Sequence, residues 1–117
     1  MEQIRTIAEQ FNLPGLWEKI KKDPPINPFS SDGCSGWVEE WEGVSLYQAC
    51  FLHDLKYWAG YPKEDVARLE ADAELMIDVA NALGSTWMAE TMFRGVRAGG
   101  HEGLKLAFSW GFGRRKP

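Results

Sequence analysis

Hydrophobic side chains recur every three or four residues over much of the chain, which is the spacing of α-helices with one buried face. Near the N-terminus, the apolar positions from Ile4 to Phe11 predict a helix over residues 2–11. A short helical turn is expected over residues 16–21. Three prolines within residues 23–28 exclude a regular element there, because proline lacks an amide donor and has a fixed φ.

The most informative helix is expected in the middle of the chain. Ser45 is a suitable residue to cap its N-terminus, and Gly60 is a suitable residue to end it. Positions separated by three or four residues lie on the same side of a helix. Four residues of this segment therefore share one face: Leu46, Cys50, His53 and Tyr57.

A second long helix follows after a short connection. It is expected to begin near Pro62, a favourable first-turn residue, and to stop at Gly84. Asp72 lies close to the apolar stripe of this helix. The positions expected to face the core are Val66, Leu69, Ala73, Met76 and Ala80.

A third helix is predicted from Ser85 to about Ala98, before two consecutive glycines. Arg94 and Arg97 on this helix are expected to be solvated or paired with acidic residues of the second long helix. The remainder, residues 101–117, is an irregular tail rich in glycine and aromatic side chains, and strand signals are weak throughout. The expected fold is a single all-α domain over residues 1–117, with two long antiparallel helices at its centre.

Composition narrows the class of protein. Of 117 residues, 44% are hydrophobic and 26% are charged, which is typical of a folded globular domain and not of a disordered chain. The formal net charge of -4, without a basic stripe, argues against a nucleic-acid partner. No stretch is long and apolar enough to span a bilayer. Residues 1–10 have no apolar signal-peptide core, so no signal peptide is visible.

The candidate chemistry lies at the adjacent pair His53 and Asp54. A histidine is the usual general base near neutral pH, and it needs a carboxylate from another segment to orient its ring. Asp72 on the next helix is a candidate for that carboxylate. The side chain of Asp54 points about 100° away from His53 around the helix, so it is placed to bind a cation instead.

A loop of small residues, 30–36, precedes this helix and contains glycines that can take unusual backbone angles. Its backbone carbonyls, together with the carboxylate of Asp54, would suit calcium. The chain has two cysteines, Cys34 in this loop and Cys50 one turn before Asp54. They are either one disulfide or two buried thiols, and neither belongs to a zinc-type CxxC pair.

These features together resemble a known family. The segment Cys50-Phe51-Leu52-His53-Asp54-Leu55-Lys56-Tyr57 resembles the active-site motif of secreted phospholipases A2, Cys-x-x-His-Asp-x-x-Tyr. The upstream segment Asp32-Gly33-Cys34-Ser35 is similar to the family's calcium loop in its bacterial form. Asp72 stands where the family has the aspartate that holds the histidine. The resemblance covers roughly residues 30–80.

The resemblance implies a role for each motif residue. His53 would take a proton from the water that attacks the sn-2 ester of a phospholipid, while Asp72 holds the histidine and Tyr57 helps to fix Asp72. A disulfide would join Cys34 to Cys50, which favours a secreted or periplasmic protein. The implied partner is a phospholipid membrane surface, and the implied cofactor is calcium. Its implied ligands are Asp54 and the carbonyls of Gly33, Ser35 and Trp37.

Three other hypotheses remain beside the hydrolase. The chain could be a lipid-binding or membrane-docking module that has the fold without turnover. It could be a metal-dependent phosphohydrolase of the HD type, but such sites need a histidine upstream of the His-Asp pair, and His53 is the first histidine of this chain. It could also be an all-helical interaction domain in which the adjacent His53 and Asp54 have no function. Separation of His53 from Asp72 in the structure would favour this last hypothesis.

Overall fold

The computed structural model describes residues 2–31, 40, 41, 43–104, 106 and 108–116. The described part is mostly helical, as predicted. Its helices are α1 (Glu2–Gln10), α2 (Pro14–Lys22), α3 (Tyr47–Ala59), α4 (Asp65–Leu83) and α5 (Trp87–Gly99), with a 3-10 turn at Glu102–Leu104. The weak strand signals correspond to one small antiparallel hairpin of β1 (Glu40–Trp41) and β2 (Val44–Ser45).

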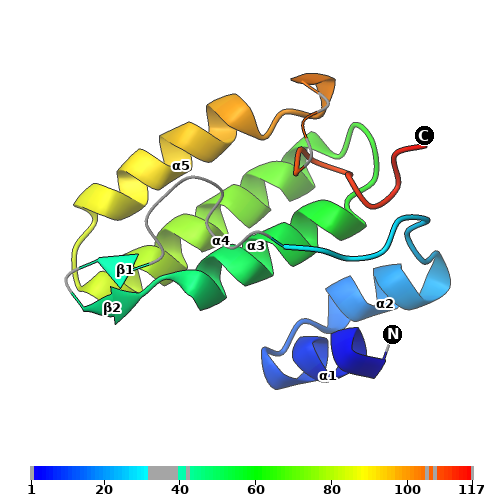
Figure 1. The fold of residues 1–117 in the computed structure, drawn as a ribbon, viewed down its shortest axis with the longest axis horizontal. Helices are drawn as coiled ribbons and strands as arrows, with labels where there is room; N and C mark the ends of the chain where they lie inside the picture. The colour runs from blue at the N-terminus through cyan, green and yellow to red at the C-terminus, as the bar shows by residue number, and fades with distance from the viewer. Residues whose placement is uncertain (1, 32–39, 42, 105, 107, 117) are drawn as a thin grey trace.

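The helices form a layered arrangement with α4 in the middle (Figure 1). α3 and α5 run along its two sides, and α1 and α2 lie beyond α3. The short connection between α3 and α4 reverses the chain, so these two long helices are antiparallel as predicted. Side chains of α3 and α5 can therefore both meet a side chain that α4 presents toward them.

Two apolar clusters lie at the two ends of this helical layer. The first cluster is built from α3, α4 and α5, and its buried members include Leu46, Cys50, Leu75, Val79, Ala89 and Met92. The second joins α2, α3 and α4 to the C-terminal tail, and its buried members include Ile20, Leu55, Trp58, Ala71, Trp110 and Phe112. A polar group of buried residues, described below, lies on the same helices.

The predicted inner face of α4 is partly wrong. Val66 is 69% exposed and Leu69 is 45% exposed, although the apolar pattern places both toward the core. Met76 and Ala80 are partly buried against the first cluster, as predicted. The residues of α4 that are actually buried are Arg68, Ala71, Asp72, Leu75 and Val79. Two of these are charged, so a prediction based on apolar spacing assigns the wrong stripe to the first half of the helix.

α3 and α4 begin later than predicted, by one and three residues respectively. α3 begins at Tyr47 instead of just after Ser45, whose hydroxyl accepts the Tyr47 amide proton at 3.3 Å. α4 begins at Asp65, three residues after Pro62. It ends at Leu83 and stops at Gly84 as predicted, and this glycine takes a left-handed φ of 66°.

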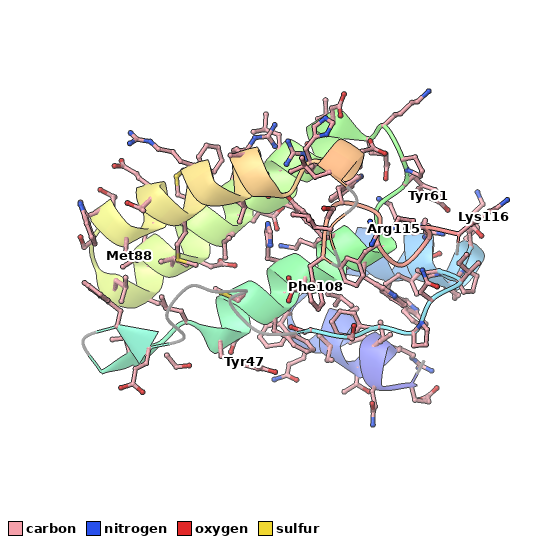
Figure 2. The ribbon with its side chains drawn as sticks, turned by 45° about the horizontal axis from the view of Figure 1, so that its top comes forward. Tyr47, Tyr61, Met88, Phe108, Arg115 and Lys116 are labelled. Carbon is pink, nitrogen blue, oxygen red and sulfur yellow. The ribbon has the colours of Figure 1, made fainter. Side chains whose placement is uncertain are left out.

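The aromatic tail is part of the packed structure. Trp110 donates its indole proton to the Tyr61 carbonyl at 2.8 Å, and the amide of Asn27 donates to the Gly113 carbonyl at 2.8 Å. The guanidinium of Arg114 lies 4.0 Å from the centre of the Tyr61 ring. Figure 2 shows Tyr61 at the same end of the molecule as Arg115 and Lys116. The tail therefore connects the end of α3 to the segment that follows α2.

Candidate functional site

His53 and Asp72 meet between α3 and α4, as the sequence predicts. The Nε2 atom of His53 lies 2.7 Å from Oδ1 of Asp72, which is hydrogen-bonding distance. His53 is 8% exposed and Asp72 is fully buried. With Nε2 on the carboxylate, the other ring nitrogen, Nδ1, is the one that can face a reacting molecule. The pair has the geometry of a general base held by a carboxylate.

Tyr57 lies one turn after His53 on α3 and also contacts the Asp72 carboxylate. Its hydroxyl donates a hydrogen bond to the same oxygen of Asp72 at 2.6 Å, and its ring centre lies 4.3 Å from that of His53. Burial, followed by the hydrogen bond to the Asp72 carboxylate, raises the pKa of Tyr57 well above its ordinary value. The hydroxyl therefore stays protonated and remains a donor to Asp72.

Two arginines approach the other oxygen of Asp72. Arg97 of α5 donates from Nη1 to Oδ2 at 2.9 Å, and Nη1 of Arg68 lies 3.6 Å from the same atom. Of the two alternatives considered for Arg97, pairing with an acidic residue of α4 is therefore confirmed, whereas Arg94 is exposed. Sequence reasoning missed Arg68. The signal was its position four residues before Asp72, which places both on one side of a helix.

Asp54 faces a different partner from His53, although the two are neighbours in sequence. Its Oδ2 accepts a hydrogen bond from the Ser31 hydroxyl at 2.7 Å, and it is 5% exposed. Ser31 belongs to the segment 30–36 that is predicted to form the calcium loop. The predicted division of the two side chains is therefore present, with His53 toward α4 and Asp54 toward that segment.

The donor chemistry at Asp54 fits calcium, because carboxylate and hydroxyl oxygens are the hard ligands that this ion prefers. Among the described residues no group of three or more His, Cys, Asp or Glu side chains could hold a metal ion. A site built from one carboxylate and backbone carbonyls does not need such a group. The predicted carbonyl ligands of Gly33, Ser35 and Trp37 lie outside the described residues.

The predicted disulfide concerns the same loop. Cys50 is buried on α3 and is not a free thiol, but Cys34 lies outside the described residues. The pairing of Cys34 with Cys50 therefore stays a prediction.

A pair of adjacent glycines at the end of α5 provides a sensitive test of the packing around Tyr57. A Cβ at Gly100 would lie 2.5 Å from the Tyr57 hydroxyl oxygen and 2.7 Å from the Val96 carbonyl oxygen, whereas a Cβ at Gly99 meets nothing within 4 Å. We expect Gly100→Ala to lower the free energy of unfolding by about 1–3 kcal/mol, as other overpacked sites do.

Gly99→Ala is the matched control. It is expected to leave stability unchanged or raise it by about 0.5–1 kcal/mol, since alanine is the better helix former. Urea denaturation of the two variants and the wild type measures both values. Equal stability of the two variants would contradict the close approach of Tyr57 to the end of α5.

Comparison with known proteins assigns neither a family nor a function to this site. Within the part of the chain that the structure describes, none of the helices has the length and apolar character needed to cross a membrane. No protein-family model, curated protein or solved structure significantly matches the chain.

Proposed function

We propose that this protein is a calcium-dependent, phospholipase A2-like hydrolase that cleaves the sn-2 acyl ester of glycerophospholipids. The observation that carries the proposal is the 2.7 Å contact between His53 Nε2 and Asp72 Oδ1. It joins the histidine of the Cys-x-x-His-Asp-x-x-Tyr motif to the aspartate that the resemblance pairs with it. Tyr57, the last residue of the motif, donates to the same oxygen.

The proposed reaction uses both nitrogens of His53. Nδ1 accepts a proton from a water molecule as the water oxygen attacks the ester carbonyl carbon. The imidazolium that forms is stabilised through Nε2 by the Asp72 carboxylate, which Tyr57 holds. When the tetrahedral intermediate collapses, the bond from carbon to the glycerol oxygen breaks, and Nδ1 returns the proton to that oxygen. The products are a fatty acid and a lysophospholipid.

Asp54 and the loop carbonyls of Gly33, Ser35 and Trp37 would hold calcium. When bound, the ion supplies positive charge for the ester oxyanion and for the lipid phosphate. Asp54 is suited to this role because it is buried beside Ser31 and faces away from the Asp72 group. The proposal therefore assigns the general base and the metal ligand to two neighbouring residues with different partners.

The test is release of fatty acid from phospholipid vesicles that carry different labels at the sn-1 and sn-2 positions. We expect release of the sn-2 label in the presence of calcium, no release with a calcium chelator, and a loss of about 10²–10⁴-fold in rate for His53→Ala, which removes the general base. His101→Ala is the control, because the second histidine is exposed and, among the described residues, its side chain bonds only to the nearby Gly103 amide.

Two outcomes would contradict the proposed reaction. Absence of release from every phospholipid tested in the presence of calcium argues against hydrolysis. If the protein nevertheless sediments with the vesicles, a lipid-binding module on the same fold explains the result. Release in His53→Ala at the wild-type rate would exclude His53 as the base, whatever the substrate.

A further inference from the structure

The two oxygens of the Asp72 carboxylate have different kinds of partners. Oδ1 lies 2.7 Å from Nε2 of His53 and accepts a hydrogen bond from the Tyr57 hydroxyl at 2.6 Å. Oδ2 accepts a hydrogen bond from Nη1 of Arg97 at 2.9 Å, and Nη1 of Arg68 lies 3.6 Å from the same oxygen. Among the described residues, no arginine donates a hydrogen bond to Oδ1, the oxygen that contacts the proposed base, and the contacts of Arg68 and Arg97 are made to Oδ2.

Arg68 and Arg97, named here the arginine clasp, connect α4 and α5 in both directions. Arg68 extends from α4 to the last turn of α5, where it donates to the Val96 carbonyl at 3.3 Å and the Arg97 carbonyl at 3.4 Å. Arg97 extends from α5 back to Asp72 on α4. Each arginine therefore depends on the helix that carries the other.

The negative charge of the buried Asp72 carboxylate explains why an arginine is needed. Asp72 has no exposed surface, and an ionised carboxylate is costly to bury unless a charged partner is present. The Tyr57 hydroxyl is a neutral donor, and a His53 that acts as a base is neutral before the reaction. The arginine clasp supplies the positive charge. Of its two members, Arg97 makes the shorter contact with the carboxylate.

The geometry of a carboxylate adds a second reason. Asp72 can turn about its terminal bond, which is only weakly restricted, and this would exchange or tilt its oxygens. A charged donor held on Oδ2 opposes that rotation, since it would have to break a charge-assisted hydrogen bond. Oδ1 is then kept in the direction of His53 and Tyr57.

We propose that Arg97 is a positioning residue for the hydrolysis reaction, which holds Asp72 so that Oδ1 faces Nε2 of His53. The inference rests on the proposed function for its kinetic consequence, but the positioning itself is a property of the folded protein. It assigns to α5 a part in the site, although none of the motif residues lies on that helix. Arg97 acts through Asp72 and touches neither substrate nor water in the reaction.

The kinetic test replaces Arg97 and follows release of the sn-2 fatty acid. Arg97→Gln is expected to lower kcat by about 100-fold with little change in KM, because a misplaced catalytic group slows the chemical step without weakening substrate binding. Arg97→Lys keeps the charge and is expected to recover part of kcat. Guanidinium at millimolar concentration is expected to restore part of kcat in Arg97→Ala, since the Arg97 side chain is 31% exposed and its place is open to solvent.

Arg94→Gln is the matched control. Arg94 lies one turn before Arg97 on α5 and is exposed, and its side chain makes no hydrogen bond or ion pair among the described residues. It is expected to keep the wild-type kcat. An unchanged kcat in Arg97→Gln would overturn the proposal, and so would a loss in Arg97→Gln that neither lysine nor guanidinium restores, because that result indicates a structural role alone.

A spectroscopic measurement tests the positioning without any reaction. In protein with ¹⁵N-labelled histidine, the proton on Nε2 of His53 is expected to resonate far downfield, as protons in short hydrogen bonds to carboxylates do. A His101→Asn variant identifies which signal belongs to His53. Arg97→Gln is expected to shift or remove this signal, whereas Arg94→Gln should leave it in place.

This second measurement separates failure of the inference from failure of the proposed function. A protein that hydrolyses no lipid but loses the His53 signal in Arg97→Gln still supports positioning by Arg97. A signal that stays unmoved in Arg97→Gln overturns it even if the enzyme is active. If Arg97→Gln does not fold, Arg97→Lys is used in its place. The Arg97→Ala variant gives a further comparison. The proposal is supported if the His53 signal is absent from this variant alone and returns to its wild-type position when guanidinium is added.

Discussion

The Asp72→Ala variant is expected to unfold with a free energy about 3–5 kcal/mol below that of the wild-type protein, because removing one partner of a buried ion pair leaves the other charge uncompensated. The side chain of Arg68 is 7% exposed, so it cannot regain full hydration after the carboxylate is removed. Arg97 and the Tyr57 hydroxyl lose their acceptor in the same change. The loss is a large share of the stability of a domain of this size.

Chemical denaturation followed by circular dichroism measures this difference. Glu70→Ala is the matched control, because Glu70 is exposed on the same helix and its side chain makes no hydrogen bond or ion pair among the described residues. It is expected to change the free energy of unfolding by less than about 0.5 kcal/mol. A loss of similar size in the two variants would show that Asp72 does not hold the buried group together.

The Asp72→Asn variant is expected to lower kcat by about 10⁴-fold, which is the size of effect seen when the carboxylate that orients a catalytic histidine becomes an amide. Arg97 offers only donors, so it will take the amide oxygen of the new side chain. The amide nitrogen then faces Nε2 of His53 and donates to it. The ring proton must move to Nδ1, and the nitrogen that should accept a proton from water is already protonated.

Comparison of the rates of Asp72→Asn and Tyr57→Phe distinguishes this cause from general damage to the site. Tyr57→Phe removes one donor to Oδ1 without changing the tautomer of His53, so its kcat is expected to fall much less than that of Asp72→Asn. Circular dichroism checks that both variants are folded at the assay temperature. A kcat for Asp72→Asn within tenfold of the wild type would contradict the role of Asp72 as the orienting carboxylate.

Much of the candidate site could be predicted because it depends on local spacing. Cys50, His53 and Tyr57 follow one another at helical intervals, and each is buried on α3. The separation of Asp54 from His53 is also local, since adjacent residues on a helix point about 100° apart. Asp72 was predictable as a partner because a short connection makes α3 and α4 antiparallel neighbours.

The rotation of α4 could not be predicted in the same way. The apolar pattern favours Val66 and Leu69 as inner residues, but in the structure both are exposed, and Arg68 and Asp72 are buried near them. Periodicity arguments assume that the buried face is apolar. Here the buried face carries an ion pair, which is stable only because α3 and α5 supply its hydrogen-bond partners.

The sequence by itself determined the helical class, the inward face of α3, and the candidate roles of His53, Asp54 and Asp72. These follow from residue spacing along one helix or across one short connection. Only the tertiary structure decided that Arg97 and not Arg94 reaches Asp72, that Arg68 is buried beside it, and that the aromatic tail packs against the end of α3. The physical reason is that these contacts join segments far apart in the chain, and their partners are selected by how the helices pack and not by local spacing.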